Sequence, residues 1–77
     1  MEIIMIVETS TCVNIFGNTV TQIFILHNGS CYCHSSNGSE TLIFPAEKSN
    51  GSYRKTSSFE ILDFALCEEI SRIANQT

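Results

Sequence analysis

The sequence has no tryptophan, a single proline, and only four basic residues against eight acidic ones. Proteins that bind nucleic acids neutralise phosphates with a basic surface, so we expect no direct contact with nucleic acid. The chain also lacks the run of roughly 20 apolar residues that a membrane-spanning helix needs. The formal net charge of −4 favours a neutral or basic protein surface as the partner.

The length of 77 residues predicts one domain that spans residues 1–77. A chain this short cannot build a second core, and 43% hydrophobic against 16% charged residues excludes intrinsic disorder. A cavity that encloses a substrate would take up much of so small a core. Because the sequence also has no catalytic motif, we expect neither an enzyme nor a bound cofactor.

The start of the chain has an apolar run of five residues, 3–7, but lacks the basic segment and the length of a signal peptide, which predicts a cytoplasmic protein. In that compartment thiols stay reduced. The four cysteines are therefore expected to be small apolar core residues without disulfides: Cys12, Cys31, Cys33 and Cys67.

Residues 2–8 are predicted to form a strand whose side chains point alternately to two faces, both of them apolar. This places the strand inside the sheet rather than at an edge. A second apolar run covers residues 13–16 and a third covers residues 19–27. Gly17-Asn18 between them fits either a tight turn or a bulge in one long strand, and we favour the bulge.

Asn28-Gly29 and Asn37-Gly38 each lie between apolar runs, the pattern of a two-residue type I′ hairpin. They predict a meander of three antiparallel strands over residues 19–27, 30–35 and 40–44. Pro45 is expected to end the last strand. Residues 46–56 read as an irregular segment with a turn at Asn50-Gly51, or with a short strand around Tyr53.

Ser57 and Glu60 have the spacing of a capping box, so a helix is predicted from there to about Asn75. Its apolar residues recur every three or four positions and form one stripe: Phe59, Leu62, Leu66, Ile70 and Ile73. The predicted fold class is therefore α+β. It has an antiparallel sheet, made of the meander and an N-terminal strand, with one C-terminal amphipathic helix packed on one face.

Two-residue loops at both hairpins assign each side chain of the meander to a face. One face is apolar throughout and is expected to receive the helix: Phe24, Leu26, Cys31, Cys33, Leu42 and Phe44. The other face then has an uncovered apolar patch with a histidine at its rim, which predicts a partner-binding surface: Ile23, Ile25, Tyr32, His34 and Ile43. The alternative is that the chain start or the loop around Asn50 covers this face.

A second candidate contact lies on the outer side of the predicted helix. A spacing of about 100° per residue places Ile61 and Phe64 there, together with Glu68. An exposed phenylalanine beside acidic residues is a plausible anchor for a partner. The alternative is a wider apolar stripe that buries Phe64 beneath the loop around Asn50.

Cys31-Tyr32-Cys33-His34 resembles a metal-binding or catalytic cysteine–histidine sequence. On a strand, however, the two thiols point to one face and the imidazole to the other, and C-x-C is not the usual spacing of zinc ligands. We therefore expect no metal and no catalytic thiol at this segment.

The chain resembles the small inhibitor proteins of phages and other mobile elements, the anti-CRISPR proteins in particular. The resemblance rests on its length, acidic balance, meander with one helix, missing enzymatic motif and apolar patch. It implies a non-enzymatic inhibitor that binds a protein subunit of a CRISPR-Cas-type defence complex in the cytoplasm of a bacterial host. The inhibitors that mimic DNA are far more acidic, and these proteins share no motif that would assign a role to any residue. The alternative is a module that forms a homodimer through the open sheet face.

Overall fold

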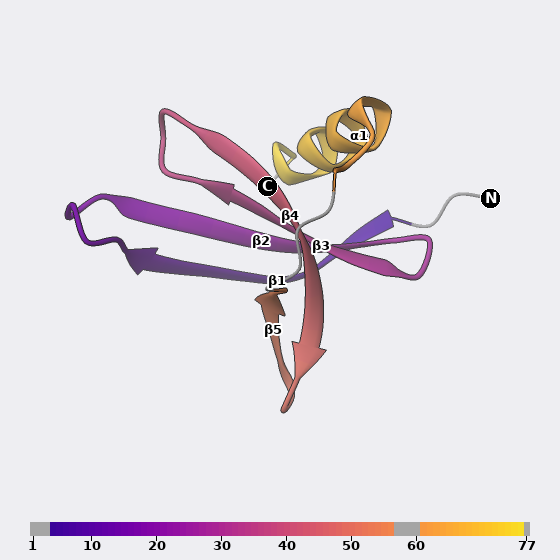
Figure 1. Ribbon diagram of the computed structural model, residues 1–77, viewed down its shortest axis with the longest axis horizontal. Helices are drawn as coiled ribbons and strands as arrows, with labels where there is room; N and C mark the ends of the chain where they lie inside the picture. Colours follow the sequence, from indigo (N-terminus) through magenta and orange to yellow (C-terminus); the bar gives the residue numbers. More distant parts are fainter. Residues whose placement is uncertain (1–3, 57–60, 77) are drawn as a thin grey trace.

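The computed structural model describes residues 4–56 and 61–76. Within these ranges the chain forms five strands and then one helix (Figure 1): β1 Ile4–Val13, β2 Thr19–His27, β3 Ser30–Ser36, β4 Thr41–Ser49, β5 Ser52–Lys55 and α1 Phe64–Ala74. The strands form one antiparallel sheet in the order β1-β2-β3-β4-β5. The predicted α+β class, with an antiparallel sheet and a C-terminal helix, is confirmed.

Asparagine–glycine pairs make two of the hairpin turns. Asn28 and Gly29 have φ angles of 50° and 88°, and His27 pairs with Ser30 across a two-residue loop. Asn50 and Gly51 form the same kind of loop, with φ angles of 51° and 83°. Positive φ at both central positions is what a type I′ turn requires, and asparagine and glycine tolerate it best.

Asn37-Gly38 does not form a two-residue turn. The loop has four residues, because Ser36 pairs with Thr41. The side-chain oxygen of Asn37 accepts hydrogen bonds from the backbone N–H groups of Ser39 and Glu40, at 3.0 and 2.8 Å. This shifts the predicted register by two residues, an even number, so every side chain keeps its predicted face.

β1 differs from its predicted form in length and position. It continues to Val13 and lies at the edge of the sheet rather than inside it. Gly17 belongs to a turn instead of the favoured bulge, and Asn14 organises that turn by accepting hydrogen bonds from the N–H groups of Phe16 and Asn18. The register of β1 shifts between Ile6 and Glu8 instead.

Pro45 lies within β4 and does not end it. Its carbonyl accepts a hydrogen bond from Thr56 N–H at 3.0 Å, so the polar atoms of Pro45 point toward the β5 side. In an antiparallel sheet these groups alternate between the two neighbouring strands. The missing N–H of proline therefore costs no hydrogen bond between β3 and β4.

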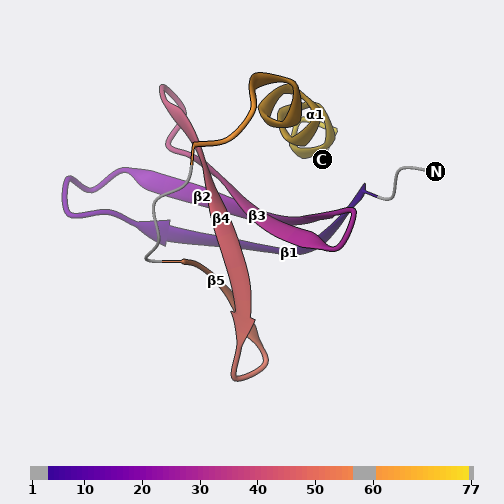
Figure 2. The ribbon, with the colours of Figure 1, turned by 45° about the vertical axis from the view of Figure 1, so that its right-hand side comes forward.

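β4 bends, and the two halves of this strand pair with different neighbours. Residues 41–46 pair with β3, and residues 46–49 pair with β5. The β4–β5 hairpin leaves the sheet on the side opposite α1, as both ribbon views show (Figures 1 and 2). The ring of Tyr53 stacks on the ring of Phe24 in β2, with centroids 5.9 Å apart.

The side chains of the meander lie on the predicted faces of the sheet, but each face is covered by a different element from the predicted one. α1 packs on Ile23 and Ile25, with Tyr32 and Ile43 against the same cluster. The expectation that this face lies open is therefore wrong: α1 covers it, and Ile4 and Ile6 of β1 pack against the same cluster. The face of Phe24 and its neighbours, expected to receive the helix, has the β4–β5 hairpin instead.

α1 is shorter than predicted because residues 61–63 precede it in non-helical conformation. Asp63 is the N-cap and makes no capping hydrogen bond with its side chain. The predicted capping box of Ser57 and Glu60, and Phe59 with it, fall outside the described residues. Ile70 is buried against the sheet and Leu66 and Ile73 pack on the same cluster, which confirms the apolar stripe within α1.

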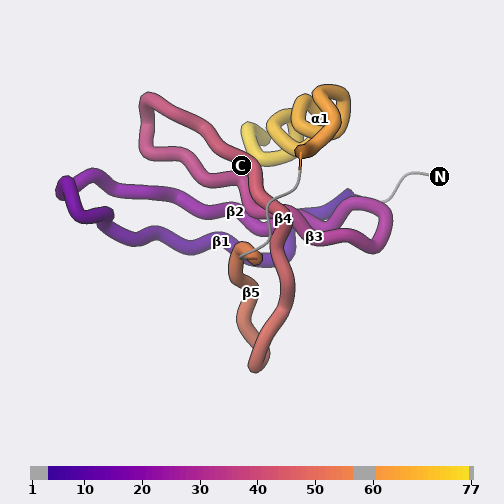
Figure 3. Tube along the Cα trace, viewed as in Figure 1, coloured from indigo at the N-terminus to yellow at the C-terminus, as the bar shows by residue number. Residues whose placement is uncertain are grey.

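The turns lie at opposite ends of the molecule. The tube in Figure 3 shows the β1–β2 and β3–β4 turns at one end and the β2–β3 turn at the other. No helix in residues 4–56 and 61–76 has the length and apolar character needed to cross a membrane.

Replacing Gly29 with valine is expected to destabilise the protein by about 1–3 kcal/mol, because a β-branched side chain resists a positive φ. A Cβ at this position would meet no atom within 4 Å, so the loss is conformational and not steric. Urea denaturation measures it. Gly29→Asn is the control and should lose less stability, since asparagine tolerates this conformation; equal losses for both variants would contradict the turn assignment.

Replacing Ile25 with alanine is expected to cost about 2–5 kcal/mol, because its side chain is 0% exposed beneath α1. The matched control is Ile61→Ala, since Ile61 is 85% exposed and its truncation should leave the melting temperature nearly unchanged. Thermal denaturation followed by circular dichroism measures both. Similar melting temperatures for the two variants would mean that α1 does not cover Ile25.

Candidate protein interaction site

Five of the eight residues predicted to bind a partner lie on the sheet face beneath α1: Ile23, Ile25, Tyr32, His34 and Ile43. They are buried or half-buried, so they do not form the open patch that the sequence predicted. Ile23, Ile25 and His34 are buried, so a partner could reach these three only if α1 moved away, whereas Tyr32 and Ile43 are half-buried.

The other three residues remain exposed and form what we call the helix surface: Ile61, Phe64 and Glu68. Ile61 is 85% exposed and Phe64 is 76% exposed. Phe64 and Glu68 lie one helical turn apart on the same side of α1. The alternative that Phe64 is buried under the Asn50 loop is therefore wrong.

Acidic side chains accompany these apolar residues. Asp63 and Glu68 are exposed, and Glu69 follows them on the helix. Arg72 donates a hydrogen bond to the carboxylate of Glu69, and this bond lowers the pKa of Glu69. Three acids against one base leave this helix with a negative surface beside its apolar residues.

A second exposed apolar site, which sequence reasoning missed, lies at the β1–β2 turn. Ile15 and Phe16 are 93% and 80% exposed, and Val13 is exposed beside them. The sequence interpretation placed these residues in a strand, where alternate side chains would be buried. The signal that could have revealed the turn is Asn14 together with Gly17-Asn18, since asparagine side chains organise such turns.

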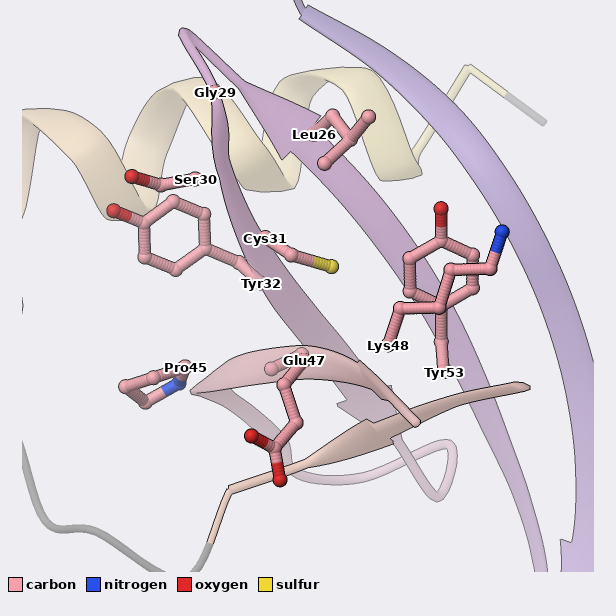
Figure 4. A pocket seen from close by; sticks show the side chains of 10 residues that line it. Leu26, Gly29, Ser30, Cys31, Tyr32, Pro45, Glu47, Lys48 and Tyr53 are labelled. Carbon is pink, nitrogen blue, oxygen red and sulfur yellow. The ribbon is translucent and has the colours of Figure 1, made fainter. Parts of the chain in front are cut away.

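A groove of about 500 Å³ lies between the β2–β3 turn and the β4–β5 hairpin. Figure 4 shows the Cys31 sulfur on the side where Lys48 and Tyr53 lie. The ammonium group of Lys48 lies over the Tyr53 ring, 5.6 Å from its centroid. Burial raises the pKa of the Cys31 thiol, which makes it a weaker nucleophile at neutral pH.

The cysteines are only partly the core residues that the sequence predicted. Cys33 is fully buried, and burial raises its pKa to about 11 although the charge of Lys55 opposes this. Cys12 is exposed, so the core prediction is wrong for that residue. The opposite directions of the Cys33 and His34 side chains are confirmed by the register. Among the described residues, no group of three or more His, Cys, Asp or Glu side chains could hold a metal ion.

His34 is a buried polar residue within the apolar layer beneath α1. Its side chain is 5% exposed, and its Nδ1 atom has no hydrogen-bond partner among the described residues. Burial lowers the pKa of the imidazole, and its own backbone offsets this only in part. The neutral form is therefore the one that the fold accommodates.

Stability should consequently decrease as the pH falls below the ordinary histidine pKa of about 6.5. With a pKa lowered by folding, the unfolded chain binds the proton first, so the contribution of neutral His34 is present above that pH and is lost as pH falls through the folded-state pKa. Urea denaturation between about pH 8 and pH 5 measures this. His34→Leu should show a flatter pH dependence over this range, and an unchanged slope would contradict the assignment.

Comparison with known proteins finds no match to the chain among protein-family models, curated proteins or solved structures. Large apolar side chains are exposed at the β1–β2 turn and next to the start of α1.

Proposed function

We propose that this protein is a small non-enzymatic inhibitor that binds another protein directly through the helix surface. The observation that carries the proposal is the exposure of Ile61 and Phe64 beside acidic residues. Both side chains expose apolar surface to water. Burying that surface against a partner would stabilise the complex.

Phe64 is the anchor of the proposed contact. Aromatic residues that fill a pocket in the partner often dominate the binding energy, while the residues around them exclude water. Phe64 is held on the first turn of α1, whose other side is fixed to the sheet by Ile70 and Ala74. The anchor is thus presented by a rigid element, which reduces the conformational entropy lost on binding.

The acidic residues indicate the kind of partner. Glu68 beside Phe64, and Asp63 before it, suit an apolar pocket with a basic rim. Basic surfaces of this kind are found where proteins contact nucleic acid. An inhibitor bound at such a surface would block access of the nucleic acid through contact between proteins, without binding nucleic acid itself.

The proposed target follows from the resemblance to anti-CRISPR proteins: a protein subunit of a bacterial defence complex of the CRISPR-Cas type, in the cytoplasm of the host. A role without catalysis is supported by the raised pKa values of Cys31 and Cys33, because neither thiol is activated as a nucleophile. The earlier alternative, a homodimer through an open sheet face, loses its basis because α1 covers that face.

Phe64→Ala is expected to weaken binding to the target complex by about 10-fold or more, the effect of removing a hot-spot side chain. The experiment mixes purified defence complexes with the protein and measures both Kd by calorimetry and the remaining nuclease activity. Phe64 is exposed, so the variant should keep its melting temperature.

Ile15→Ala is the matched control, since Ile15 is also exposed but lies at the β1–β2 turn. It should bind and inhibit like the wild type. Inhibition that survives Phe64→Ala but not Ile15→Ala would contradict the helix surface, and failure of the wild-type protein to inhibit any such complex would contradict the proposed target.

A further inference from the structure

β1 forms an open edge of the sheet. No strand among residues 4–56 and 61–76 pairs with its outer side, and at ten residues it is longer than any other strand. An edge strand presents unpaired backbone N–H and C=O groups to solvent, and these groups can pair with a strand of another chain. The side chains from Thr9 to Val13 are all exposed, so none of them is held in the core.

The hydrogen bonds of the turn show which backbone groups face outward. Asn14 N–H donates to the Asn18 carbonyl at 3.0 Å, so the backbone of Asn14 faces β2. These groups alternate along an antiparallel strand. The N–H and C=O groups of Val13, Thr11 and Thr9 therefore face away from the sheet.

The irregularity of β1 and its charged residue both lie at or before Glu8, and the part of the edge after Glu8 carries no side chain of the kind that usually prevents pairing. Natural edge strands are protected by lysine, proline or inward-pointing charges. Residues 9–22, which cover the second half of β1, the turn after it and the first four residues of β2, contain no charged residue and no proline. The charged residue of β1 is Glu8, at the irregularity between Ile6 and Glu8.

The edge is also complementary to itself. Exposed apolar side chains lie at both of its ends, with Met5 (49% exposed) near the start of β1 and Ile15 and Phe16 in the turn after it. An antiparallel arrangement of two copies brings the start of one strand next to the turn of the other. A two-fold axis at Thr11 would bury these apolar groups against one another.

We propose that two copies of this chain associate edge to edge through β1, in antiparallel register centred on Thr11, to form one continuous sheet. Thr11 then pairs with Thr11, and Thr9 with Val13, through the outward backbone groups. Glu8 faces Asn14, and the two Glu8 residues lie roughly 20 Å apart at about 3.4 Å per residue, so like charges do not meet. This proposal is independent of the helix surface.

Light scattering coupled to size-exclusion chromatography tests the association under reducing conditions. The mass should rise from 8.6 kDa for one chain toward twice that value between low micromolar and submillimolar concentrations. A mass that stays at one chain over this whole range would overturn the proposal.

Thr11→Lys should keep the protein folded and monomeric throughout, because it places two lysines opposite each other at the two-fold axis. Thr11→Pro should have the same result, since it removes an outward N–H. Thr41→Lys, the same change at an exposed strand position away from β1, is the control and should dimerise like the wild type. Dimerisation of folded Thr11→Lys equal to that of the control would overturn the proposal.

The register is tested by cross-linking. Ser10 of one copy should lie opposite Cys12 of the other, so Ser10→Cys should form a covalent dimer under mild oxidation, seen on a non-reducing gel. The double variant Ser10→Cys/Cys12→Ser should form far less, because each new thiol then faces a serine. Equal cross-linking by both variants would overturn the register centred on Thr11.

Discussion

The structure depends on one constraint: both faces of the sheet are apolar, and the chain has few elements with which to cover them. Ile23 and Ile25 alternate along β2 with Phe24, so one strand supplies buried side chains to both sides. α1 covers the side of the isoleucines, and the bend in β4 brings Tyr53 over Phe24 on the other. Burial on both faces gives a short chain more core than a sheet with one solvated face could provide.

The elements that the sequence predicted well are those fixed by local chemistry. Asn28-Gly29 specifies its turn because both residues must adopt positive φ, and the period of two then assigns each side chain to a face. The place of Pro45 inside a strand could not be predicted, because the effect of a proline depends on which neighbour its backbone faces, a property of the assembled sheet. The loop at Asn37-Gly38 is longer than the dipeptide predicts because the Asn37 side chain stabilises four loop residues.

The covering of the faces could not be predicted from periodicity, since it depends on how β4 bends and where the chain re-enters to form α1. Two apolar faces are equivalent by pattern alone. The residues of the candidate site show the same difference between local periodicity, which can be predicted, and the covering of a face, which cannot. Phe64 and Glu68 are exposed as predicted because helical periodicity is local, and Ile61 is exposed although it precedes the helix. Ile23 and Ile25 are buried instead of exposed because α1 covers the face opposite to the predicted one.

Because α1 and the β4–β5 hairpin cover the two faces, the surfaces left for interaction are peripheral: the start of α1, the β1–β2 turn and the β1 edge. All of these surfaces depend on the packing of α1 on the Ile25 face. Nuclear Overhauser effects in protein with labelled methyl groups and aromatic rings test this packing directly. We expect cross-peaks between the methyl groups of Ile70 and Ile25, and between the rings of Phe24 and Tyr53. Cross-peaks from Ile70 to Phe24, with none to Ile25, would contradict this packing.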